Sequence, residues 1–157
     1  MGERVHLFGG MVSFKPPAEF STLTEEQVRK NFKAVLRPGI YYGSKDVRAA
    51  VAVGYLEQKD LRSEQLGLIK AQLEKKFAAL PAFSWVENGL VEINGVRWVN
   101  LEADYKDDKG KSIRNNVCLT LVEGHGLIMF GFSSNKGDYE KYSKVLRESK
   151  GTIEIQK

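Results

Sequence analysis

The dipeptide Asn94-Gly95 constrains this chain most, because it lies between two runs of alternating apolar residues. Asn-Gly is a preferred pair for a two-residue type I′ turn, whose twist matches that of the flanking strands. Further glycine-containing turns follow at 107–110 and 124–126. The predicted strands of this antiparallel meander are 90–93, 96–105, 112–123 and 127–133.

Three segments outside the meander have helical patterns. Thr24 and Gln27 have the spacing of a capping box, which predicts a short helix to about Ala34 that Pro38-Gly39 ends. A second helix, closed by Pro81, places apolar residues at three- and four-residue spacing, namely Leu66, Ile69, Leu73, Phe77 and Leu80. A third helix is predicted from Asp138 to Ser149, with Tyr142, Val145, Leu146 and Ser149 on one side.

Other segments have extended patterns. Residues 4–8 and 12–15 flank Gly9-Gly10 and predict two short strands. Residues 47–55 predict a strand with one well-buried face, and the tail at 152–155 predicts a little extended structure. Helices before and after a meander, without βαβ alternation, indicate an α+β fold with helices packed on an antiparallel sheet. A length of 157 residues indicates a single domain, 1–157.

The charge pattern argues against a nucleic-acid partner. Lys and Arg number 24 against 20 Asp and Glu, which gives a net charge of +4. Near the C-terminus the cations alternate with acidic residues, which is typical of a solvated surface rather than a basic arm. The chain contains no apolar run of the roughly 20 residues that a membrane helix needs, so no integral membrane segment is expected.

The N-terminal sequence leaves two cellular locations possible. Met1-Gly2-Glu3-Arg4 lacks the charged and apolar regions of a signal peptide, so the chain as written is expected to be cytoplasmic. Alternatively, a secretion or lipoprotein signal has been removed ahead of Glu3. The protein would then belong to a bacterial periplasm or envelope.

The sequence predicts no catalytic constellation, no metal site and no cofactor. His125 lies between two glycines of a predicted turn, and Cys118 lies inside an apolar strand, where cysteine is usually a buried hydrophobe. The acidic residues Asp104, Asp107 and Asp108, with Glu102 nearby, lack the twelve-residue spacing of a calcium loop. The enzymatic alternative is a metal-dependent or acid/base site that combines this acidic turn with His125.

Five residues on adjacent predicted strands form the candidate partner-binding set: Arg97, Trp98, Arg114, Asn115 and Asn116. Arg and Trp are enriched among residues that dominate the energy of protein interfaces. The structural alternative is that Trp98 lies in the core and that the two arginines pair with Glu92 or Glu102 across strands. Trp85 is predicted to pack beneath the second helix.

Several of these features together resemble one superfamily. The opening 7–20, the hairpin 93–98, the segments 114–116 and 126–133, and the last-helix tyrosines Tyr139 and Tyr142 are similar to PsbP-like and DcrB-like domains. The resemblance implies an α/β/α sandwich with a central antiparallel sheet and helices on both faces. The superfamily includes a photosystem subunit, a Ran-binding import factor and bacterial lipoproteins, and it implies a protein partner without a shared active site.

The sequence therefore favours a non-enzymatic protein-binding domain of bacterial origin, which acts as an adaptor, chaperone or inhibitor. The alternatives are an immunity protein against a delivered toxin, the metal-dependent enzyme described above, and a nucleic-acid-binding protein that uses the basic surplus.

Overall fold

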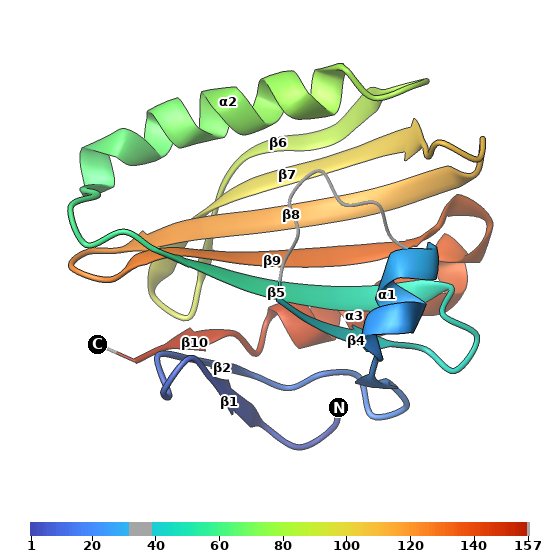
Figure 1. Cartoon of the computed structure of the whole chain (residues 1–157), viewed down its shortest axis with the longest axis horizontal. Coiled ribbons are helices and arrows are strands. Elements are labelled where there is room, and N and C mark those ends of the chain that lie inside the picture. Colours follow the sequence, from blue (N-terminus) through green and yellow to red (C-terminus); the bar gives the residue numbers. More distant parts are fainter. Residues whose placement is uncertain (32–38, 157) are drawn as a thin grey trace.

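The structure is a computed structural model that describes residues 1–31 and 39–156. A seven-stranded antiparallel sheet has the strand order β3-β4-β5-β9-β8-β7-β6, and a small sheet has the order β1-β2-β10 (Figure 1). The strands of the large sheet are β3 (Ser21–Thr22), β4 (Ile40–Gly43), β5 (Ala49–Glu57), β6 (Ser84–Ile93), β7 (Val96–Lys106), β8 (Ser112–Val122) and β9 (Gly126–Asn135). The other strands and the α-helices are β1 (Val5–Leu7), β2 (Val12–Phe14), α1 (Glu25–Asn31), α2 (Leu66–Ala78), α3 (Tyr139–Lys150) and β10 (Glu154–Ile155), and short 3-10 helices η1 (Ser63–Gln65) and η2 (Lys136–Asp138) precede α2 and α3.

The meander β6-β7-β8-β9 confirms the prediction from the turns. Asn94 and Gly95 both adopt positive φ, 46° and 81°, as a type I′ turn requires, and they join β6 to β7. Strand β6 begins at Ser84 rather than at Leu90, with an irregularity in its pairing between Trp85 and Glu87. The sequence does not indicate this extension, because Glu, Asn and Gly are all depleted in strands.

Strands β3 and β4 were not expected from the sequence, because each is too short to show alternation. Strand β5 was expected to bury one face, but Ala50 and Ala52 are buried as well as Val51 and Val53. Both faces are covered because Val51 and Val53 pack in the core that contains Phe14 and Leu146, whereas Ala52 packs with Leu23 and Tyr41, beside Val28 of α1. Small alanine side chains allow the covering layer on their face to approach closely.

Helix α2 covers one face of the sheet. Leu73 and Phe77 are buried against alternate residues of the meander, with Leu66, Ile69 and Leu80 packed at the edge of this cluster. The predicted apolar face of this helix is therefore confirmed. Its partners on the sheet are Val99, Leu101, Ala103, Val117 and Leu119.

Helix α3 and the small sheet cover the opposite face. Their core contains Leu146 of α3, Val12 and Phe14 of β2, and the fully buried Trp98 of β7. Figure 1 shows α3 and the small sheet beside the lower strands of the large sheet. Because the two clusters use alternate residues of the same strands, the fold is a sandwich with helices on both faces, as predicted.

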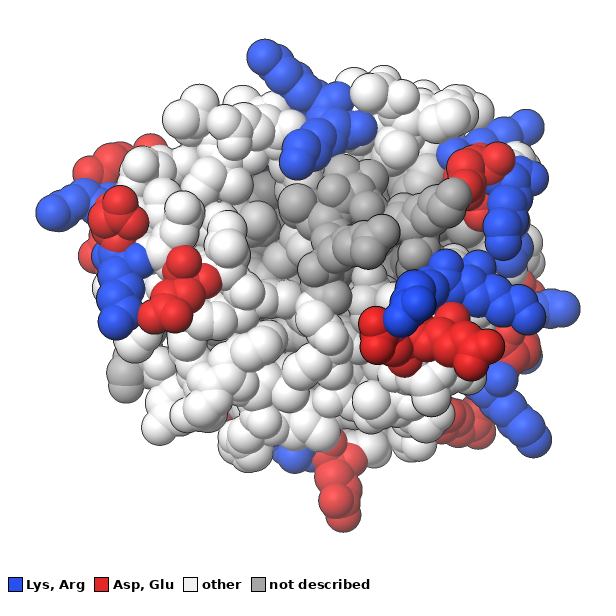
Figure 2. Space-filling model, viewed as in Figure 1, with Lys and Arg blue, Asp and Glu red and all other residues white. Residues whose placement is uncertain are grey.

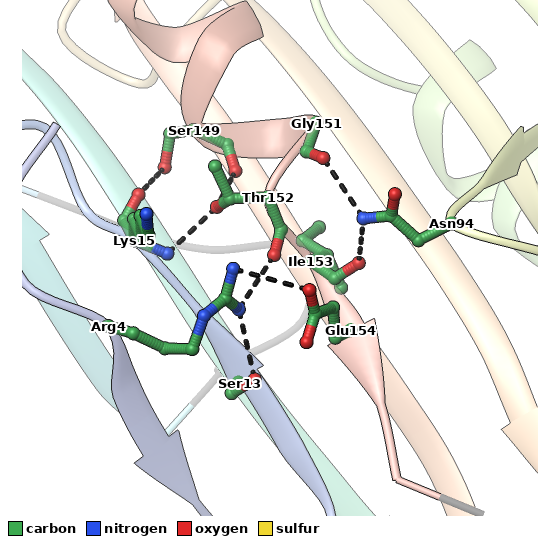
Figure 3. A network of polar contacts seen from close by, with 9 residues as sticks. All are labelled: Arg4, Ser13, Lys15, Asn94, Ser149, Gly151, Thr152, Ile153 and Glu154. Carbon is green, nitrogen blue, oxygen red and sulfur yellow. Dashed lines mark hydrogen bonds and ion pairs between the residues drawn. The ribbon is translucent and has the colours of Figure 1, made fainter.

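A polar network joins the small sheet to the end of α3 and to the β6–β7 turn (Figure 3). The Asn94 side-chain amide donates to the carbonyl oxygens of Gly151 and Ile153, at 3.1 and 2.8 Å. Arg4 donates to Ser13 and to the Thr152 carbonyl oxygen, at 3.0 and 2.9 Å. The bond to Gly151, the C-cap residue of α3, satisfies a carbonyl that the helix leaves unpaired, and the bonds to Thr152 and Ile153 hold the segment that follows it.

The N-terminal capping box of α1 is confirmed. The Thr24 hydroxyl accepts from the Gln27 amide at 3.2 Å, and the Gln27 side chain accepts from the Thr24 amide at 2.9 Å. The predicted end of this helix, Ala34 with Pro38-Gly39, involves positions 32–38, which lie outside the described residues. Among the helices that the structure describes, none is both long and apolar enough to cross a membrane.

The β8–β9 turn supplies a matched pair of glycine substitutions. Gly124 and Gly126 both have positive φ, 79° and 154°, but only Gly126 packs against other backbone, where a Cβ atom would overlap the Leu56 carbonyl oxygen. We expect Gly126→Ala to lower the free energy of unfolding by more than about 3 kcal/mol. Gly124→Ala meets no neighbour within 4 Å and should cost about 1 kcal/mol. Equal losses in chemical denaturation would contradict this packing.

Candidate functional site

The five predicted partner-binding residues lie on two opposite faces of the sheet. Arg97 and Asn115 share the face that α2 covers, since their neighbours Val99 and Val117 belong to the α2 cluster. The other three face α3. Trp98 is fully buried, and its ring centroid lies 5.9 Å from that of Phe130. Trp98 therefore lies in the core, as the alternative to the partner-binding prediction stated, and a partner cannot contact it.

Arg114 belongs to a partly buried ion pair. It donates two hydrogen bonds of 2.7 Å to the Asp104 carboxylate, and its guanidinium lies 4.3 Å from the centre of the Tyr139 ring. Lys136 approaches the same carboxylate at 3.4 Å. Bonding to Arg114 lowers the pKa of Asp104 and raises the pKa of Arg114. The bidentate geometry links two neighbouring strands beneath α3.

Asn116 belongs to a buried polar cluster at the end of α3. Its side-chain amide donates to Asn100 at 2.7 Å, and the Lys150 ammonium donates to the side-chain oxygens of Asn100 and Asn116 at 2.8 and 2.9 Å. Asn100 donates in turn to Glu87 at 2.9 Å. Such bonds offset the desolvation of buried polar groups.

The reactive groups of this cluster are not activated. Burial raises the pKa of the Cys118 thiol to about 11, so the thiol is protonated at neutral pH. Burial, with the neighbouring Glu87, raises the pKa of Glu102. Cysteine nucleophiles require the opposite shift, toward the thiolate. This geometry therefore supports a structural role for Cys118.

The structure does not bring together the groups of the enzymatic alternative. Asp104 pairs with Arg114, and the Asp107 carboxylate accepts from the amides of Lys109 and Lys111 within the β7–β8 turn. His125 lies in the turn at the other end of β8. In the described part of the chain, no three His, Cys, Asp or Glu side chains are grouped to hold a metal ion.

Asn115 lines a cavity of about 380 Å³ on the α2 face of the sheet. Described residues of α1, α2, β5, β8 and β9 surround this cavity. The side-chain amide of Asn115 donates a hydrogen bond of 3.3 Å to the Tyr105 hydroxyl. Burial raises the pKa of Tyr105.

Arg97 lines a separate and wider groove, which we call the α2–β6 groove, of about 760 Å³. It lies between the N-terminal part of α2 and the β6–β7 hairpin. Its described lining residues are Ser63, Leu66, Gly67, Lys70, Gly89, Leu90, Gly95, Val96, Arg97, Val99, Thr120 and Leu121. Leu90 is 56% exposed although it is a large apolar residue. Arg97 was among the predicted residues, whereas Leu90 was not. The sequence signal for Leu90 is an apolar residue two positions from the polar residues Asn88 and Glu92, on the same side of the strand.

The Arg97 backbone is hydrogen-bonded to a neighbouring strand, while its guanidinium has no ion-pair partner among the described residues. The Thr120 hydroxyl donates to the Arg97 carbonyl oxygen at 2.8 Å. Arg97 stands opposite Glu92 in the strand register, yet no ion pair joins its guanidinium to a carboxylate of the described residues. Lys70, the other cation of the groove, pairs with Glu74 at 3.1 Å.

Strand β6 forms a long edge of the large sheet beside this groove. Its residues from Ser84 to Asn88 are all exposed, and Trp85 packs only partly, against Phe77 and Phe83. The prediction that Trp85 lies beneath the second helix is right about the contact, but the side chain remains 37% exposed. The opposite edge, β3, has only two residues.

Charged groups on the face seen in Figure 2 are of mixed sign. Lysines and arginines at the two sides of this view lie beside aspartates and glutamates, and one further basic group stands at the top without acidic neighbours. That distribution is typical of a solvated surface. The absence of a nucleic-acid partner stays a prediction.

The ion pair between Asp104 and Arg114 predicts a specific pH dependence. A lowered pKa means that the pair stabilises the fold fully above the unfolded pKa of about 3.9 and loses this contribution as the pH falls through the folded pKa. Asp104→Asn should lower the free energy of unfolding by about 1–3 kcal/mol at pH 7. In denaturation measured from pH 7 to pH 2, the difference from the parent protein should shrink in acid; a constant difference would contradict the pair's role.

No protein-family model matches this sequence, and no curated protein matches it by sequence. Solved structures with the same architecture do match. LpqN of Mycobacterium tuberculosis superposes with a TM-score of 0.66 and 12% identity, over 99% of this chain and 90% of LpqN. A protein of Bacteroides thetaiotaomicron gives 0.65 and 13% identity over 99% of this chain, which spans about half (49%) of that protein.

Two further structures agree with the resemblance found in the sequence. Cyanobacterial PsbP (CyanoP) of Synechocystis gives a TM-score of 0.63 and 10% identity, over 98% of this chain and 92% of CyanoP. The Ran-binding protein Mog1p of Saccharomyces cerevisiae gives 0.56 and 12% identity, over 99% of this chain and 95% of Mog1p. At such identities the likeness concerns the fold. The chain therefore shares its fold with LpqN, CyanoP and Mog1p.

Proposed function

We propose that this chain is a non-enzymatic protein-binding domain that docks its partner in the α2–β6 groove. The observation that carries the proposal is that one groove is lined by an exposed leucine, Leu90, and by an arginine, Arg97, whose guanidinium makes no ion pair with a carboxylate of the described residues. Arginine is enriched at protein interfaces relative to the rest of the surface, and Leu90 adds an exposed apolar side chain beside it. An adaptor, a chaperone and an inhibitor all fit this description.

The other predicted residues support this surface from inside. Arg114 and Asn116 have their hydrogen bonds satisfied beneath α3, and Trp98 fills the core between the sheet and α3. The proposal therefore keeps Arg97 as a contact residue. It assigns to the others the task of holding β7 and β8 rigid, because a fixed surface loses less entropy on binding.

The structural relatives support a binding role and a bacterial origin. Mog1p is described as a Ran-binding protein, so this fold can present a protein-binding surface. LpqN, CyanoP and the Bacteroides protein come from bacteria. Neither argument specifies the partner of this chain.

Photo-crosslinking tests the proposed surface. A benzoylphenylalanine residue placed at position 90 should form discrete adducts with a protein in the cells that make this chain, because the side chain lies in the docking groove. The same residue at Lys144, an exposed position on α3, is the matched control and should form none. Adding Arg97→Glu should remove the adducts at position 90. Adducts only at position 144, or adducts at position 90 that persist in Arg97→Glu, would contradict the proposal.

A further inference from the structure

The outer edge of β6 carries backbone groups without hydrogen-bond partners. Among the described residues, β6 makes its backbone hydrogen bonds with β7 alone. Antiparallel partners alternate between pairs that exchange both backbone bonds and pairs that exchange none. Every second residue of an edge strand therefore directs its amide and carbonyl away from the sheet.

The β6–β7 turn identifies which residues these are. A two-residue turn makes its flanking residues, Ile93 and Val96, a hydrogen-bonded pair. Counting back along the register, Val91 and Gly89 also bond to β7, and the groups of Glu92, Leu90 and Asn88 point outward. The irregularity between Trp85 and Glu87 ends this regular edge. The edge available to another strand is thus Glu87 to Ile93.

Natural proteins usually shorten or cover such edges, because an open edge accepts strands from other chains. The edge formed by β3 follows this rule, because that strand is only two residues long. The β6 edge is long, and the side chain of its central outward residue, Leu90, is 56% exposed. Leu90 also lines the α2–β6 groove, so the backbone edge and the groove form one continuous surface.

We propose that the edge from Glu87 to Ile93 binds an extended segment of the partner as an additional strand of the large sheet. This inference rests on the docking surface proposed above and specifies how that surface is used. Strand addition supplies affinity through backbone bonds and specificity through alternate side chains. The segment places an apolar side chain over Leu90 and a carboxylate toward Arg97, the cation of the groove that makes no ion pair with the described residues, since Lys70 is paired with Glu74. Glu92 lies outside the lining of that groove.

A matched pair of substitutions at Glu92 tests the backbone bonds. Peptides are selected from a phage-displayed library on the whole folded chain, then synthesised and titrated. Glu92→Pro removes one outward amide, whereas Glu92→Thr keeps it and removes the same carboxylate. We expect the selected peptides to have an apolar residue at every second position and to contain an acidic residue. Their Kd should rise at least about tenfold in Glu92→Pro, with little change in Glu92→Thr.

A measurement on the unaltered chain keeps the test independent of how the proline variant folds. The amide hydrogens of Asn88, Leu90 and Glu92 should exchange fast in the free protein. Bound peptide should lower their exchange rates at least about tenfold. The amides of Gly89 and Val91, which bond to β7, should be protected in both states.

The outcomes separate this inference from the proposed function. Strand addition is overturned if no peptide is enriched, if exchange at the three outward amides does not slow, or if the chain pairs its β6 edges in a dimer. If Glu92→Pro binds like Glu92→Thr while Arg97→Glu abolishes crosslinks at position 90, the groove binds a partner by another mode. If position 90 forms no crosslinks, the docking surface itself is wrong.

Discussion

The rest of the structure depends on the Asn94-Gly95 turn. Its two positive φ angles fix the register of β6 against β7, and a slip of one residue would move every side chain of a strand to the other face. Trp98 would then leave the α3 core. The Asn94 side chain adds a second constraint, because it binds the carbonyl groups of Gly151 and Ile153 and so ties the hairpin to the end of α3.

This constraint decides which surfaces of the meander are covered. One face is occupied by α2 and the other by α3 and the small sheet. Beneath α3, Arg114 is paired with Asp104, and Lys150 is hydrogen-bonded to Asn100 and Asn116. Such groups stabilise the fold more readily than they act on a ligand. The two layers leave open the cavity beside Asn115 and the side of the meander where β6 ends the sheet, and the proposed docking surface, with Leu90 and Arg97, lies on that side.

Local chemistry made much of this fold predictable. The Asn94-Gly95 turn, the Thr24 capping box and the apolar face of α2 each depend on residues close in sequence, and the structure has all three. Strands β3 and β4 and the first half of β6 depend on pairing with distant strands, so their sequences carry little signal. The candidate set failed to form one site for a geometric reason: Asn115 and Asn116 are neighbours in sequence, but a strand directs them to opposite faces.

The most direct test of the account is a chemical-shift map of the isotopically labelled chain, titrated with the partner captured by crosslinking at position 90. The account predicts that the largest changes follow β6, the N-terminal part of α2 and Arg97, with the amides of α3 almost unmoved. Changes centred on α3 or on the small sheet would contradict it, because they would place the partner on the face that the fold closes.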